Sequence, residues 1–119
     1  RGLYNWIAAG EIADLCKRIY TKTAVGGRWD ELALRILGWQ LDKERLRVLL
    51  PDEARVANKP GEQEETMHDA GVIWTDDFAY SICVATTGWK NRSKAFMTIA
   101  EISRLVYDAI SPKCRGNNA

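Results

Sequence analysis

Four consecutive residues near the middle of the chain, Lys59-Pro60-Gly61-Glu62, combine features that could do chemistry. They follow a short stretch, residues 55–58, whose β-branched Val56 favours a strand. A lysine at the exposed end of a strand offers a positive charge, and a glycine lets another group approach the backbone closely. A surface strand that simply ends at a proline–glycine turn would show the same residues. The stretch therefore predicts the end of a strand, which either binds a ligand or is a surface strand that leads into a turn.

Two further groups of residues could handle protons or a cation. In His68-Asp69 the aspartate could orient the imidazole for proton transfer, but neighbours in a strand diverge, which favours a capping pair. Glu62, Glu64 and Glu65 could bind a cation, although a solvated acidic loop is the more common meaning of such a run. One histidine and three cysteines at unsuitable spacing predict no zinc site, and we expect no cofactor.

The remaining reactive or aromatic residues favour packing roles. Trp74 and Trp89 could stack on a ligand, but they stand near the expected hairpin ends, where packing is the usual role. Cys16 and Cys83 fall at apolar positions and are expected to behave as small hydrophobic residues. Cys114 lies in a polar tail, where it could be a free thiol. No disulfide framework is expected.

Length and composition limit the class of protein. The chain has 119 residues, enough for one domain or part of one, and 46% apolar with 28% charged residues is ordinary globular usage. A formal net charge of +1 gives no footprint for nucleic acid or a membrane surface, and no apolar run is long enough to span a membrane. The chain starts at Arg1 without a methionine, so we expect a processed, trimmed or excised product.

The first half of the chain, residues 1–51, has the periodicity of helices. Apolar residues recur at helical spacing in residues 8–20 and again in residues 29–37. A third short helix is expected over residues 41–50, closed by Pro51.

After Pro51 the period becomes that of strands. Residues 55–59, 70–74 and 78–86 are expected to form an antiparallel meander, with an acidic loop at residues 62–66 and a tight turn at residues 75–77. In the third strand large residues alternate with small ones, and we expect the final helix, residues 93–110, to pack on the small face. The expected fold is therefore α/β in the broad sense (α+β), with residues 1–51 and 52–119 forming one partial domain. The expected buried stripe of the final helix is Phe96, Ile99, Ile102, Val106 and Ile110.

The order of these pieces resembles the C-terminal half of a known family. Lys59-Pro60-Gly61-Glu62, then His68-Asp69-Ala70-Gly71-Val72-Ile73, then a hairpin and a long helix resemble the class A-like branch of the serine β-lactamase and penicillin-binding-protein superfamily. That branch has a K-T-G-E segment, an H-D-A-G-like strand start and a final helix on the sheet. Leu37-Gly38-Trp39-Gln40 through Leu49-Leu50-Pro51 resembles its approach to the K-T-G strand. The resemblance covers roughly residues 3–111.

The resemblance implies acyl-enzyme chemistry on β-lactam or peptidoglycan-type amides, within a three-layer fold. By it, Lys59 faces the nucleophilic serine and attracts the substrate carboxylate, and the backbone N–H of Glu62 belongs to the oxyanion hole. Lys59, Pro60, Gly61 and His68 are then the expected substrate-binding residues, with Pro60 and Gly61 on the floor of a cleft. Pro60 replaces the threonine of K-T-G, so the hydroxyl that binds the carboxylate is missing, which puts β-lactam turnover in doubt.

The resemblance also implies that a part of the enzyme lies elsewhere. The four serines, Ser81, Ser93, Ser103 and Ser111, begin neither S-x-x-K nor S-D-N. The nucleophile is therefore expected on an upstream segment or a companion chain, and the strand over residues 78–86 is expected to have an open edge that pairs with that partner or with a second copy. A secreted, periplasmic or cell-envelope location follows by resemblance. Two alternatives stay open: a non-catalytic binding or scaffold module of this family, and an unrelated small α/β domain.

Overall fold

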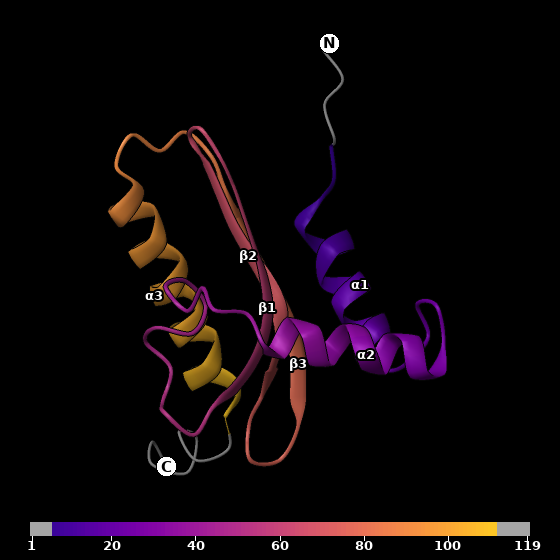
Figure 1. Cartoon of the computed structure of the whole chain (residues 1–119). Helices are drawn as coiled ribbons and strands as arrows, with labels where there is room; N and C mark the ends of the chain where they lie inside the picture. The colour runs from indigo at the N-terminus through magenta and orange to yellow at the C-terminus, as the bar shows by residue number, and fades with distance from the viewer. Residues whose placement is uncertain (1–5, 112–119) are drawn as a thin grey trace.

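Helices cover both faces of one antiparallel sheet (Figure 1). The structure is a computed structural model that describes residues 6–111. The sheet has the order β1-β2-β3, so the predicted meander is confirmed and both β1 and β3 are edge strands. The elements are α1 (Ala9–Tyr20), α2 (Gly27–Gly38), β1 (Arg55–Gln63), β2 (Thr66–Trp74), β3 (Ala79–Thr86) and α3 (Arg92–Ile110).

The two N-terminal helices form where their periodicity predicts them. At the start of α1 the Ala8 N–H donates to the Glu11 carboxylate at 2.9 Å, which satisfies one of the free donors of a helix end. The loop into α2 is organised by Asp30, which is 1% exposed and accepts hydrogen bonds from three consecutive N–H groups, those of residues 24–26. Burial opposes ionisation of Asp30, but these hydrogen bonds outweigh it and lower the pKa of its carboxyl.

The helix predicted over residues 41–50 is wrong: no helix forms there, and residues 44–50 are bends and turns. Tertiary contacts explain the difference. The Leu46 N–H donates to the Asp69 carboxylate at 3.2 Å, and the Leu46 carbonyl accepts from the Ser103 hydroxyl at 2.8 Å. The backbone of Leu46 is therefore hydrogen-bonded to the sheet and to α3, where a helix would have used it internally.

The first hairpin is longer than its sequence predicts. β1 continues through Pro60 to Gln63 and β2 begins at Thr66, so the predicted acidic loop is reduced to a turn at Glu64 and Glu65. Glu64 has a φ of 41°, which closes this turn. A proline inside the strand is tolerated because β1 is an edge strand, where half of the N–H groups face away from the sheet.

The predicted face for the last helix is also wrong. α3 packs on the large residues Tyr80, Ile82 and Val84 of β3, whereas α1 packs beside Ala79 and Cys83 on the small face. Figure 1 shows α3 and α1 on opposite sides of the sheet. The shorter α1 approaches the small side chains closely, while the bulky side chains of α3 match the large face.

α3 covers the expected residues but turns a different stripe inward. It begins at Arg92, and the Asn91 side chain caps it by accepting from the Lys94 N–H at 3.1 Å. Phe96 and Ile99 are buried as predicted, but Ile102 is 37% exposed. The buried stripe is completed by Ala95, Ala100, Ser103 and Tyr107.

Two further observations complete the fold. Cys114 and the rest of the tail lie outside the described residues. Across residues 6–111, no helix combines the length and the apolar character that crossing a membrane requires.

Candidate active site on the edge strand

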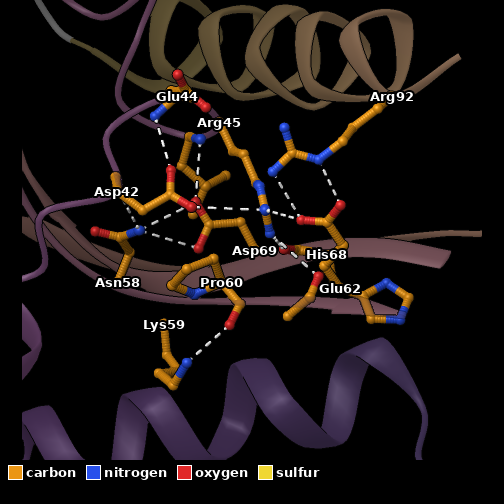
Figure 2. Close-up of polar contacts among 12 residues, drawn as sticks. Asp42, Glu44, Arg45, Asn58, Lys59, Pro60, Glu62, His68, Asp69 and Arg92 are labelled. Carbon is orange, nitrogen blue, oxygen red and sulfur yellow. Dashed lines mark hydrogen bonds and ion pairs between the residues drawn. The ribbon is translucent and has the colours of Figure 1, made fainter. Parts of the chain in front are cut away.

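Lys59 lies within β1, not at its end, and its side chain is exposed. In Figure 2 it extends away from the polar cluster, toward the helical ribbon on the other side of the sheet. Its Nζ donates to the Pro60 carbonyl at 2.9 Å. A groove of about 830 Å³ lies beside Arg55 and Trp74, toward the start of β1, and none of residues 59–61 lines it, so the cleft expected at Lys59 stays a prediction.

The side chain of Glu62 turns toward α3 and meets two arginines (Figure 2). Arg92 donates through Nε to one carboxylate oxygen and through Nη2 to the other at 3.0 Å. Arg45 Nη2 donates to Oε1 of the same carboxylate at 3.0 Å. The hydrogen bonds from Arg92, together with both positive charges, lower the pKa of Glu62 against the opposing effect of desolvation. Glu62 is therefore held as a carboxylate.

Arg45 is a buried cation that sequence analysis missed. It is 2% exposed, and its Nη1 donates to two carbonyls, that of Gly61 at 3.1 Å and that of His68 at 2.9 Å. Its guanidinium carbon lies 4.0 Å from the centre of the Phe96 ring. An ion pair with Asp42 at 3.5 Å adds a second negative charge. The sequence places Arg45 within the helix predicted over residues 41–50, and no local pattern marks it as buried.

A second buried cluster centres on Asp69, which is 1% exposed. Its carboxylate accepts from Asn58 Nδ2 at 3.1 and 3.2 Å, from the Leu46 N–H and from the Ala70 N–H at 3.0 Å. Burial raises the pKa of Asp69, and the hydrogen bonds offset only a part of that effect. The cluster attaches the segment that carries Arg45 to the middle of the hairpin.

His68 and Asp69 do not form the proton-handling pair that was considered. His68 Nδ1 accepts from the Thr86 N–H at 3.1 Å, so the ring proton resides on Nε2. Asp69 uses the donors of Asn58, Leu46 and Ala70 instead. The two residues are adjacent in β2 and face opposite sides of the sheet, so each has a separate structural role.

The other candidates are paired within the fold. Glu65 pairs with Lys90 at 3.4 Å and Glu62 pairs with Arg45 and Arg92, so two of the three acidic residues already have positive partners. Residues 6–111 bring together no set of three metal-ligating side chains. Trp74 packs edge-to-face on Tyr20, with ring centres 5.9 Å apart, and Trp89 packs against the core.

The arrangement offers two features to a ligand beside β1. The exposed Lys59 provides a positive charge, and the outward backbone groups of an edge strand provide hydrogen bonds. The strand is supported from behind by Arg45 and Asp69.

Comparison with known proteins places this geometry in a family. A family model described as the beta-lactamase enzyme family, Beta-lactamase2, matches residues 1–110. A β-lactamase structure from Chitinophaga pinensis is 29% identical, with a TM-score of 0.81 over 88% of this chain and 42% of that one.

Two further solved structures support the fold. A β-lactamase from Sphaerobacter thermophilus is 20% identical, with a TM-score of 0.86 over 91% of this chain and 42% of that one. The structure titled PBP-A is 23% identical, with a TM-score of 0.77 over 83% of this chain and 38% of that one. The comparison with curated proteins gives no match. The chain thus spans about two fifths of the solved structures it resembles, and by its sequence and fold it belongs to the β-lactamase enzyme family.

Proposed function

We propose that this chain supplies the strand side of a serine acyl-transfer site that acts on β-lactam or peptidoglycan-type amides. Lys59 would attract the carboxylate of the substrate and favour the ionised form of the attacking hydroxyl. The N–H of Glu62 would stabilise the oxyanion that forms when the hydroxyl attacks the amide carbonyl. Pro60, Gly61 and His68 would line the substrate beside them.

One observation carries the proposal: a lysine of the K-P-G segment stands exposed on the outer strand of a β-lactamase-type sheet. Its hydrogen bond to the neighbouring Pro60 carbonyl is an exposed local contact, which a substrate carboxylate can replace at little cost. The type of reaction is proposed from the family, and the exposed position of Lys59 would leave it accessible to a substrate.

The nucleophile would come from a preceding segment or a companion chain that carries S-x-x-K and S-D-N. Two surfaces support such a partner. β3 is an edge strand with unpaired backbone groups in the described sheet, and large apolar side chains of the helical half are exposed. Among them are Trp29, Leu32, Ile36 and Trp39. Sedimentation of this chain alone tests the idea: self-association, or a complex with the missing part, is expected, and a stable monomer with a protected β3 edge would contradict it.

A second candidate is a non-catalytic binding or scaffold module of the same family. Pro60 favours it, because proline lacks both the hydroxyl of threonine and a backbone N–H. We also propose a location in the cell envelope or outside the cell, because β-lactam and peptidoglycan-type amides occur there.

The charge of Lys59 gives the decisive experiment. In the complete protein, Lys59→Met should slow acylation by an anionic amide roughly 10- to 100-fold, because a hydrogen bond to a charged group contributes about 1.5–3 kcal/mol. A neutral analogue should be affected much less. Lys22→Met is the matched control, since Lys22 is exposed and pairs weakly with Glu31 at 3.9 Å.

The outcomes separate the two candidates. Equal losses with both substrates would argue against binding of a carboxylate by Lys59. A complete protein that forms no acyl-enzyme, even with Pro60→Thr to restore the hydroxyl, would favour the non-catalytic module.

A further inference from the structure

The peptide unit between Gly61 and Glu62 connects the proposed oxyanion site with a buried guanidinium. Its carbonyl oxygen belongs to Gly61 and accepts from Arg45 Nη1 at 3.1 Å. Its N–H belongs to Glu62 and is the proposed oxyanion donor. A trans peptide is planar, with its C=O and N–H pointing in opposite directions, and the described residues contain no cis peptide. Whatever fixes the carbonyl therefore also fixes the direction of the N–H.

Arg45 is itself held on several sides. Nη1 also donates to the His68 carbonyl, and His68 is the register partner of Gly61 across the hairpin. The guanidinium lies against the Phe96 ring and pairs with Asp42. At 2% exposure, it has neither the room nor a solvent path to rotate easily. A guanidinium presents its donors in a rigid plane, so its position determines where both carbonyls lie.

The carboxylate of Glu62 completes the restraint. It accepts a hydrogen bond from Arg45 Nη2 at 3.0 Å. The same guanidinium therefore binds the side chain of Glu62 and the carbonyl of the preceding residue, Gly61. Arg92 holds the carboxylate from the outer side, and its guanidinium carbon lies 4.3 Å from the centre of the Phe96 ring (Figure 2). Both arginines therefore stack on one buried ring while they share one carboxylate.

We infer that Arg45, braced by Glu62, is a positioning residue that aims the Glu62 N–H at the oxyanion. The inference deepens the proposed function and rests on it. The obvious alternative for a buried cation next to β1 is direct binding of the substrate carboxylate. The geometry points away from that role, because both terminal nitrogens of Arg45 already have acceptors and the side chain is almost fully covered.

Substrate charge separates these roles. In the complete protein, Arg45→Lys keeps the charge but loses the planar donor pair. Loss of one oxyanion donor lowers kcat by roughly 10²–10³-fold, so a misdirected donor should cost about 10- to 100-fold. We expect this loss in the acylation rate with neutral and anionic substrates alike, with KM little changed. Glu62→Gln should give a smaller loss of the same kind. Arg104→Lys is the matched control, since Arg104 donates to the Leu49 carbonyl and pairs with Asp108 of its own helix.

A readout independent of activity completes the test. In ¹⁵N spectra of the complete protein, Arg45→Lys should shift the Glu62 amide signal and speed its hydrogen exchange, while the amide of the core residue Val72 stays unchanged. A loss restricted to anionic substrates, or an unmoved Glu62 amide in a folded variant, would overturn the inference. Absence of acylation by the unmodified protein would sink the proposed function instead, and the amide measurement would still decide whether Arg45 fixes this peptide.

Discussion

Gly71 is the position where one added methyl group should do the greatest damage to the sheet. It lies in β2 opposite Asn58 of β1, and a Cβ there would stand 2.0 Å from the Ala57 carbonyl oxygen and 2.8 Å from the Asn58 Cα. Carbon–oxygen contacts normally begin near 3.3 Å, so the strands would have to move apart by about 1.3 Å. The neighbouring atoms belong to the backbone and cannot rotate away.

The cost follows from the hydrogen bonds that this separation would break. Ladder bonds of about 2.9 Å would stretch beyond 4 Å, which leaves them broken. Each buried group left without a partner costs about 1–3 kcal/mol, so two of them amount to roughly 2–6 kcal/mol. Domains are stable by about 5–15 kcal/mol, and Gly71→Ala should therefore remove a large fraction of the total.

Chemical denaturation of the complete protein, followed by tryptophan fluorescence, measures this loss. Gly61→Ala is the matched control in the same hairpin, because its added Cβ would meet only the His68 ring at 4.0 Å, an ordinary contact. We expect the control to stay within about 1 kcal/mol of the parent. If Gly71→Ala unfolds at the same denaturant concentration as the parent, the close approach of β1 and β2 described above is not real.

Two further predictions concern the core and the effect of pH. Ile99→Ala should cost about 2–5 kcal/mol because Ile99 is fully buried, whereas Ile102→Ala should cost under about 1.5 kcal/mol; equal losses in thermal denaturation would contradict the described orientation of α3. The pKa of Asp69 is raised above its ordinary value of 3.8, so the native state binds this proton more tightly than the unfolded state does. The free energy of unfolding should therefore fall as pH rises from the ordinary pKa to the raised one. Above the raised pKa the contribution of Asp69 should no longer change with pH. Asp69→Asn should remove this slope above about pH 4, and an unchanged slope would show that Asp69 is not desolvated.

The sequence predicts the order of the elements well because their signals are local. The alternation of β3 and the apolar period of α1 and α3 depend on neighbours a few residues apart, and these three elements form within one or two residues of their expected bounds. The end of β1 was predicted too early, just before Pro60. A proline is compatible with a strand only at the edge of a sheet, and the position of a strand within the sheet cannot be read from local sequence.

The site depends on contacts between distant segments, which local patterns do not contain. Arg45 and Leu46 follow the helical period, yet Asp69 and Ser103, 23 and 57 residues away, hold that segment in turns. The two faces of β3 were predicted correctly, but the small face was assigned to α3, whereas α1 covers it. The alternation of large and small residues identifies two faces and does not indicate which helix covers each. Lys59 and Glu62 could be named from the motif, whereas the guanidinium behind them required the tertiary structure.

Two cysteines between α1 and the sheet can report chemically on the packing of α1. Cys16 of α1 and Cys83 of β3 are both free and belong to the same small cluster. Burial raises the pKa of Cys16, and the nearby Cys83 adds to it; burial likewise raises the pKa of Cys83. The buried, protonated thiol of Cys16 reacts slowly with alkylating reagents, so its modification requires α1 to detach from the sheet. The alkylation rate therefore reports how often the helical half detaches, and a companion segment that clamps α1 should slow it without touching either sulfur.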